Sequence, residues 1–245
     1  MFVPPAQHGV TAVWLVGGSV RDFLLQVPPK DWDFVVQTPT YDHLKHWVQT
    51  LGGTVLVEKP EFHTLKAKLI DPVHQINYLC DLTLCRQDGP YGDRRRPDYT
   101  TIGTLEEDLK RRDFTVNAMA LGPDGHLYDP HGGQIDLEHK VLRCVRSDAM
   151  KCFEEDPLRL LRAVRFKVTL GFSFHPSLEP CLQDPALAAL LRQHVSMDRK
   201  REELKKCFQH HTSETLLTLA HYPHLMRACF DQSSLWLDPT LKARK

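Results

Sequence analysis

The sequence predicts an α+β fold, a mixed sheet with helices that is followed by an all-α segment. Short apolar runs typical of strands alternate with helical spacing in the first part of the chain, and after about residue 145 only helical spacing remains. A chain of 245 residues is long enough to bury the cores of two modest domains. We therefore expect a first domain at residues 1–144 and a second, helical domain at residues 145–245.

In the first domain, turn and capping residues mark where the elements begin and end. Gly17-Gly18 follows an apolar run, so a strand is expected to enter a tight turn there. Thr104 and Glu107 have the spacing of a capping box, which indicates a helix start. Strands are expected at 13–16, 33–36, 54–57, 64–70 and 75–84, helices at 20–26, 38–51 and 105–120, and a loop at 87–99.

The second domain shows three clear helical segments and weaker ones beyond them. Ser196 precedes the third segment and is of a type that caps helices. Residues 140–167 carry more basic than acidic side chains, which is typical either of a phosphate-binding stripe or of a solvated helix face. The three helices are expected at 149–170, 185–194 and 196–211.

The composition excludes several classes of protein. The formal net charge is zero, which argues against a uniformly basic nucleic-acid coat. We expect no contact with a membrane, because no run approaches the roughly 20 apolar residues of a membrane span. The seven cysteines include no CxxC pair, so we expect reduced thiols in a cytoplasmic protein rather than disulfides or a zinc site.

Two aspartates provide the first chemical signal. Asp31 and Asp33 are two residues apart beside an expected strand, so their side chains share one face. Parallel carboxylates repel each other, but they suit Mg2+, which commonly takes one or two carboxylates together with substrate phosphates. The pair taken alone is weak evidence, because most such pairs lie in surface loops.

The segment before this pair strengthens the signal. Glycines at 17 and 18 would let the backbone approach a phosphate closely, and Arg21 would add a positive charge. A plain strand–helix turn is the alternative. Asp81 is the best candidate for a third carboxylate, because an unpaired charge inside an apolar strand would be costly.

Four blocks in order make the chain resemble the bacterial-type (class II) tRNA nucleotidyltransferases, which are the CCA-adding enzymes, and the similar bacterial poly(A) polymerases. Together with a weaker fifth block, the resemblance covers roughly residues 12–210. The blocks are LVGGSVRDFLL to KDWDFVV (15–36), EEDLKRRDFTVNAMA (106–120), DPHGGQIDLEHKVLR (129–143), EEDPLRLLRAVRF (154–166) and, more weakly, MDRKREELKKCF (197–208).

The resemblance implies a polymerase-β-like nucleotidyltransferase head followed by a helical neck and a shortened body. It implies two-metal phosphoryl transfer with Mg2+, in which Asp31 and Asp33 bind metal and Asp81 is the third catalytic acid. It further implies a set of nucleotide-binding residues, which are Gly18, Arg21, Arg112, Asp156, Arg159, Arg162 and Arg165.

The residues of the expected neck helix agree with that implication. Asp156, Arg159 and Arg162 recur every three residues and form a drifting stripe. Asp supplies hydrogen-bond acceptors and Arg a planar fork of donors, so the stripe could bind the Watson–Crick edges of C and A. A salt-bridge ladder without a ligand is the alternative, and such a ladder contributes little stability.

The expected function is template-independent addition of C and A to tRNA 3′ ends from CTP and ATP. Poly(A) polymerase activity is the nearest alternative, because its motifs are nearly the same. A catalytically silent nucleotide- or RNA-binding protein is the alternative of another class, and it would be expected to lack a carboxylate at 31, 33 or 81. Family members usually continue further, so three alternatives stay open for this chain: a naturally minimal enzyme, a fragment, or an enzyme that relies on a partner protein or a homo-oligomer to grip the RNA.

Overall fold

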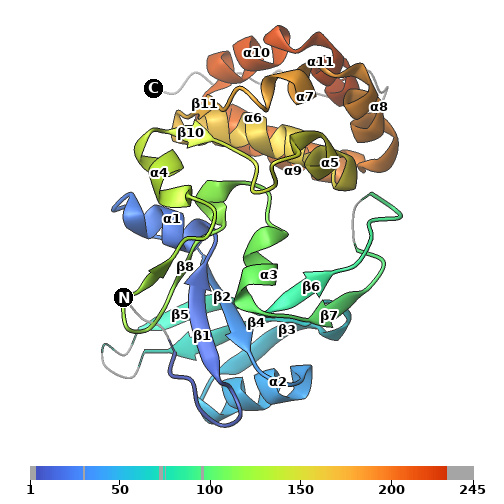
Figure 1. Cartoon of the computed structure of the whole chain (residues 1–245). Helices are drawn as coiled ribbons and strands as arrows, with labels where there is room; N and C mark the ends of the chain where they lie inside the picture. The colour runs from blue at the N-terminus through green and yellow to red at the C-terminus, as the bar shows by residue number, and fades with distance from the viewer. Residues whose placement is uncertain (1–3, 30, 72–73, 75, 95–96, 231–245) are drawn as a thin grey trace. The chain divides into compact units, whose positions relative to one another are not determined.

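The computed structural model describes residues 4–29, 31–71, 74, 76–94 and 97–230. The chain divides into two compact units, Met1–Asp148 and Ala149–Lys245, which are coloured from blue to yellow-green and from yellow-green to red in Figure 1. No helix in the described part of the chain is long and apolar enough to cross a membrane.

A mixed seven-stranded sheet forms the centre of the first unit. Its strand order is β3-β4-β5-β2-β1-β8-β9, and β2 and β5 pair in parallel whereas the other neighbours pair antiparallel. The strands are β1 (Ala12–Val16), β2 (Trp32–Gln37), β3 (Thr54–Lys59), β4 (Thr64–Ile70), β5 (Asn77–Leu84), β8 (Ala120–Leu121) and β9 (Leu127–Tyr128). All five expected strands are present, and the α+β prediction is confirmed.

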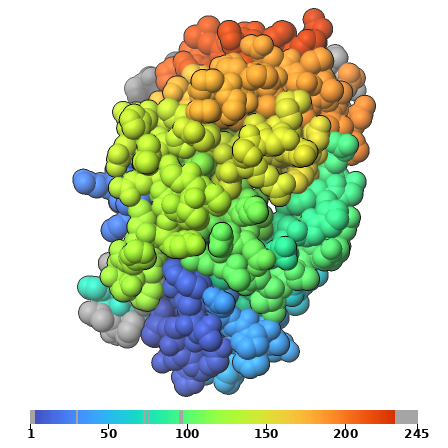
Figure 2. Space-filling view, in the orientation of Figure 1, coloured from blue at the N-terminus to red at the C-terminus, as the bar shows by residue number. Residues whose placement is uncertain are grey.

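Shorter elements complete the first unit. Part of the expected loop at 87–99 is paired, because β6 (Arg86–Asp88) and β7 (Thr100–Ile102) form a small antiparallel sheet. The segment that holds β9 and α4 lies at the surface of this unit, in yellow-green in Figure 2. The other elements are α1 (Gly18–Leu24), α2 (Tyr41–Thr50), α3 (Leu105–Lys110), α4 (Gly133–Glu138), β10 (Val141–Leu142) and two 3₁₀ turns, Pro60–Phe62 and Thr115–Asn117.

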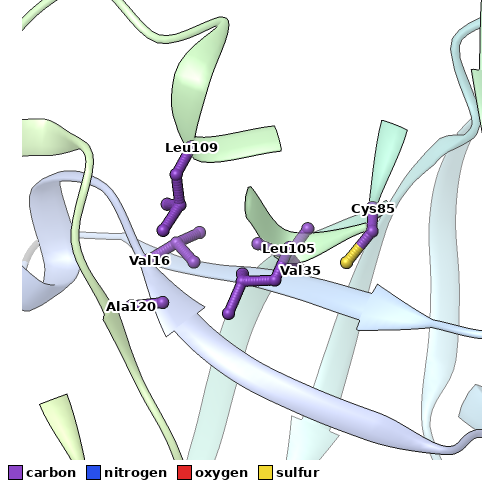
Figure 3. Packing of buried hydrophobic residues seen from close by; sticks show 6 residues of the cluster. All are labelled: Val16, Val35, Cys85, Leu105, Leu109 and Ala120. Atoms are coloured by element: carbon purple, nitrogen blue, oxygen red, sulfur yellow. The ribbon is translucent and has the colours of Figure 1, made fainter. Parts of the chain in front are cut away.

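Helices α2 and α3 cover parts of the two sheet faces. Leu105 and Leu109 of α3 point toward Val16 and Val35 of β1 and β2 in a buried cluster (Figure 3). Helix α2 packs on β3 and β4, where alternate residues of β4 are fully buried. The opposite face of β4 and β5 carries Lys66, Lys68 and Asp81, and that face leads to the candidate site.

The prediction of a helix at 105–120 is wrong beyond residue 110. The capping box of Thr104 and Glu107 is present, but the helix ends at Lys110. After that point the backbone bonds to a distant segment: Thr115 N–H donates to the Arg143 carbonyl, and Val145 N–H donates to the Asp113 carbonyl. These non-local hydrogen bonds replace the helical ones, and the chain turns through Thr115–Asn117 into β8.

The second unit is helical, as expected, apart from the two-residue strand β11 (Ser173–Phe174). The helix expected at 149–170 is broken at Pro157, which cannot continue the hydrogen-bond pattern of α5. Ser196 is the N-cap residue of α9, but its side chain makes no capping hydrogen bond. The helices are α5 (Ala149–Glu155), α6 (Leu158–Leu170), α7 (Glu179–Gln183), α8 (Pro185–His194), α9 (Met197–His210), α10 (Thr212–His221) and α11 (Pro223–Phe230).

Candidate active site

Three charged residues lie side by side across the centre of the sheet in the first unit. Asp33 of β2 pairs in register with Asp81 of β5, and Asp81 pairs in register with Lys66 of β4. Residues that are directly paired project from the same face of a sheet. Lys66 Nζ lies 3.0 Å from Asp81 Oδ2, so the third acid predicted from sequence is not an unpaired charge.

Ser19 joins the glycine turn to the aspartate pair. Its hydroxyl donates to the Asp31 carbonyl over 2.8 Å and accepts a hydrogen bond from the Asp33 N–H over 3.0 Å. The Ser19 side chain is buried, whereas Asp31 is exposed just before β2. This bridge fixes the backbone on both sides of Trp32, and therefore the direction of both carboxylates. Ser19 was not predicted as a site residue, although it lies inside the conspicuous GGSVRD segment.

The glycine turn approaches the site more closely at Gly17 than at the predicted Gly18. Gly17 has φ +67°, and a Cβ atom there would lie 3.0 Å from Arg112 Nη1 and 3.6 Å from Asp33 Oδ2. A side chain would be strained at this φ and would also fill the space between a guanidinium and a carboxylate. At Gly18 a Cβ atom would lie 3.3 Å from Arg21 Nη2.

Asn117 fixes both predicted arginines of this unit. Arg21 Nη1 donates to Asn117 Oδ1 over 2.7 Å, and Arg112 Nη1 lies 3.4 Å from the Asn117 carbonyl oxygen. Asn117 Nδ2 in turn lies 3.4 Å from Asp113 Oδ1. Asp113 therefore acts on Arg21 through Asn117, and the turn that ends the expected long helix is the part that holds the arginines.

Asp108 is the buried counter-ion of this cluster. Its two oxygens accept from Arg111 Nη2 at 2.5 Å and from Arg112 Nη2 at 2.8 Å. Burial would raise the pKa of Asp108, but the two guanidinium groups outweigh burial and hold that pKa below its usual value. The sequence analysis missed Asp108, although arginines three and four residues after an acid on a helix are a recognisable pattern.

The carboxyl of Asp33 has a strongly perturbed affinity for protons. Burial, together with the charges of Asp81 and Asp31, raises its pKa from 3.8 to about 6, against the opposing effect of Arg112. The cost of ionising Asp33 falls when positive charge is added nearby. Perturbed pKa values of this kind are typical of functional sites, although ion-pair networks also produce them.

The donor set fits a divalent cation that prefers oxygen. Within the described part of the chain, no group of three or more His, Cys, Asp or Glu side chains is arranged to hold a metal ion as it stands. Two carboxylates suffice when substrate phosphates supply further ligands, as is usual for Mg2+. Asp33, with Asp31 or Asp81 close enough to raise its pKa, offers such a pair.

The four predicted residues of the second unit do not share one helix. Asp156 lies before Pro157, outside α6, where it accepts the Leu158 N–H over 3.2 Å. Its other oxygen lies 3.2 Å from Arg199 Nη2 of α9. Burial raises the pKa of Asp156, with Arg199 and Arg159 opposing that effect.

The three arginines of α6 have different surroundings. Arg159 is 7% exposed and donates to the Cys152 carbonyl over 3.0 Å, so it points back toward α5. Arg165 Nε lies 2.9 Å and Arg162 Nη1 3.9 Å from the carboxylate of Glu203 on α9. The resemblance predicted α9 as the supporting helix, but Glu203 and Arg199, which contact the predicted set, were not predicted as site residues.

Comparisons with known proteins identify the family of this chain. The family model described as "Poly A polymerase head domain" matches residues 13–143, which is more than half of the chain. This chain belongs to the poly(A) polymerase head-domain family. The resemblance predicted from four sequence blocks is thereby confirmed.

Individual relatives and solved structures are similar to most of this chain. A CCA-adding enzyme of Geobacillus stearothermophilus is 38% identical over 207 residues, which make up 82% of this chain and 46% of that protein. The crystal structure of the Bacillus stearothermophilus CCA-adding enzyme in complex with CTP has a TM-score of 0.72 at 30% identity and covers 87% of this chain and 48% of that one.

A tRNA nucleotidyltransferase complexed with a primer tRNA and an incoming ATP analog is also similar. Its TM-score is 0.71 at 30% identity, and the match covers 90% of this chain and 59% of that one. The present chain spans about half the length of the curated relatives that it matches. What those longer proteins bind is therefore a basis for a proposal about this chain.

Replacing Ser19 with alanine tests the bridge between the glycine turn and the aspartates. Ser19→Ala removes both hydrogen bonds and leaves a buried N–H without its acceptor, so we expect a loss of about 1–3 kcal/mol in unfolding free energy. Urea denaturation measures this change in unfolding free energy. Ser213→Ala, at an exposed position of α10, is the control and should change the free energy by less than about 0.5 kcal/mol. Equal stability of the two variants would contradict a stabilising role for Ser19.

The raised pKa of Asp33 predicts a pH-dependent gain in stability for Asp33→Asn. Because the folded-state pKa lies near 6 and the ordinary value is 3.8, folding favours the protonated acid, and stability is lost as the pH rises through that range. The uncharged amide avoids this loss, so Asp33→Asn should be more stable than wild type by about 1–3 kcal/mol at pH 7.5 in EDTA.

The gain from Asp33→Asn should shrink as the pH approaches 4, where the wild-type carboxyl is protonated in the folded state. Urea denaturation at several pH values measures it, with Asp42→Asn, at an exposed position, as the control. A gain that does not vary with pH would assign the effect to packing instead of charge.

Proposed function

We propose that this protein is a template-independent RNA 3′-end nucleotidyltransferase that adds C and A to tRNA 3′ ends from CTP and ATP. The observation that carries the proposal is the row of Asp33 and Asp81 beside a glycine turn and two arginines fixed by Asn117. Carboxylates for metal, a turn without side chains for the phosphates and fixed positive charge are what phosphoryl transfer requires.

The first unit would hold the triphosphate and the attacking hydroxyl. The RNA 3′-oxygen attacks the α-phosphorus of the nucleotide, and pyrophosphate leaves. Asp31 and Asp33 would hold Mg2+, which lowers the pKa of the attacking hydroxyl and neutralises phosphate charge when bound. Asp81 would act as the third acid on the same face. Ser19 keeps both metal-binding aspartates aligned through its two hydrogen bonds.

The glycine turn and the arginines would bind the phosphates. Gly17 and Gly18 leave space beside Arg112 and Arg21 that a Cβ atom would fill. Both guanidinium groups are held by the turn at Asn117, so little side-chain entropy is lost when they meet a phosphate. Arg is well suited to this task because its planar fork matches phosphate oxygens.

The second unit would choose the base. Asp156 and the arginines at 159, 162 and 165 supply acceptors and donors that match the Watson–Crick edges of C and A. Glu203 and Arg199 on α9 hold part of this set in a fixed orientation. These side chains would replace a nucleic-acid template, because they present the hydrogen-bond donors and acceptors that a template base would otherwise present.

The comparisons support these ligands, and the cysteines bear on the cellular setting. CTP is bound in one similar structure, and a primer tRNA and an ATP analog are bound in another. We propose a reducing, cytoplasmic environment, because all seven cysteines are buried thiols. Poly(A) polymerase activity is a second candidate, because the matching family model is described by that name.

Incorporation assays separate these activities. The protein is incubated with Mg2+, a tRNA that ends before CCA, and each nucleoside triphosphate alone and in combination. CCA addition predicts that C, C and A are added and that synthesis then stops, whereas poly(A) activity predicts open-ended A tails. No incorporation with any RNA or nucleotide would exclude both enzymatic proposals.

Replacing Asp31 with alanine should abolish incorporation of every nucleotide. Removing a metal-binding carboxylate costs several kcal/mol of transition-state stabilisation, so we expect a loss of more than about 1,000-fold in rate. The assay above measures it, with Asp42→Ala, an exposed acid of the same unit, as the control. If Asp31→Ala retains activity, the assignment of Asp31 to the metal is wrong.

Replacing Arg162 with alanine should change the choice of base more than the rate. Arg162 is only partly buried, so the variant is expected to fold, and the loss of hydrogen bonds to a base edge should reduce discrimination against U and G by about 10- to 100-fold. Competition between CTP and UTP measures it, with Arg201→Ala on α9 as the control. An equal loss of rate for all nucleotides would instead assign Arg162 to phosphate binding.

A further inference from the structure

Lys66 lies beside the acids of the candidate site. Its strand position is directly opposite Asp81, and Asp81 is directly opposite Asp33. The ammonium group lies 3.0 Å from Asp81 Oδ2. The hydrogen bond with Asp81 is the largest cause of a raised pKa for Lys66, and the charges of Asp81, Asp31 and Asp33 all add to it. One ammonium group therefore interacts with every predicted catalytic acid.

A second cation near these acids, Arg112, is held by another partner. Arg112 lowers the pKa of Asp33 through its charge, but its guanidinium is bonded to the buried Asp108 at 2.8 Å. Lys66 is different, because its side chain is 33% exposed and the side chain of its partner Asp81 is 40% exposed. A flexible four-carbon stem at such a position can leave its partner without unfolding the strand.

We propose that Lys66 is an internal counter-ion that competes with the divalent cation for the carboxylates of the head and thereby sets the metal affinity of the site. The inference rests on the metal site of the proposed function. An ammonium group beside these carboxylates would repel a divalent cation that they hold, and it also occupies an oxygen of Asp81. The cation would therefore bind more weakly while Lys66 stays beside Asp81 than after it moves away.

The competition has a consequence for the metal-free protein as well. Without Lys66, Asp81 and Asp33 lie side by side with less compensating charge, and like charges that are directly paired destabilise a sheet. Removal of the Lys66 charge should therefore lower the stability of the metal-free protein and raise its affinity for a divalent cation. A residue that only packs against the sheet would not have this pair of opposite effects.

Metal binding by the full chain tests the proposal, with Mn2+ as the probe and without nucleotide or RNA. Calorimetry or electron paramagnetic resonance measures the dissociation constant, and thermal melting in EDTA measures stability. We expect Lys66→Met to bind Mn2+ about tenfold more tightly than wild type and to melt at a lower temperature in EDTA. Lys66→Arg keeps the charge and should stay within about twofold of the wild-type affinity.

Lys68→Met is the matched control. Lys68 lies two residues along β4, on the same face, and pairs in register with Leu79 instead of an acid. Its replacement should leave the Mn2+ affinity within about twofold of wild type. An equal or weaker affinity for Lys66→Met would overturn the proposal, as would equal gains for Lys66→Met and Lys68→Met, because the effect would then come from net charge alone.

Asp33→Asn separates this inference from the metal site on which it rests. If Asp33→Asn binds Mn2+ as tightly as wild type, the metal assignment itself is wrong. If Asp33→Asn abolishes binding and Lys66→Met binds like wild type, the metal assignment stands and only the role of Lys66 is overturned.

Discussion

The parallel pairing of β2 with β5 is the constraint on which the first unit depends. It places the carboxylates of Asp33 and Asp81 on neighbouring strands of one sheet face, where they repel each other. The surrounding structure offsets this repulsion in two ways. Lys66 approaches from β4, and Arg112 is held near Asp33 by a buried acid. Burial of Asp33, together with the charges of Asp81 and Asp31, still raises its pKa to about 6.

Local spacing was enough to predict that Asp31 and Asp33 share one face, but not which residues pair with the acids or fix their backbone. Asp31 and Asp33 can be assigned to one face because strand periodicity is a local property. The pairing of Lys66 with Asp81 depends on the register of β4 against β5, and that register is set by two whole strands. Ser19 could be missed for the same reason, because its two partners lie 12 and 14 residues away across a turn.

The long helix expected after Thr104 shows how a local pattern is overridden. The residues from 105 have helical spacing and a capping box, yet the backbone at 113–115 bonds to the segment at 143–145. No short-range pattern in the sequence predicts that residues 113–115 pair with the segment at 143–145. The resulting turn carries Asn117, which orients Arg21 and Arg112, so the part of the chain where the prediction fails is the part that organises the positive charge.

The stripe of Asp156, Arg159 and Arg162 in the second unit illustrates the opposite error. Its regular spacing predicts one helix and equivalent surroundings for the three residues, but their positions and contacts differ. Pro157 separates Asp156 from α6, so the spacing of three is not carried by one helix. Arg159 then turns inward to the Cys152 carbonyl, whereas Arg162 and Arg165 are oriented toward Glu203. If these residues read a base, Arg159 acts from a buried position that also supports α5. Its replacement therefore disturbs folding and base choice together, and Arg162 is the residue at which recognition can be tested separately from stability.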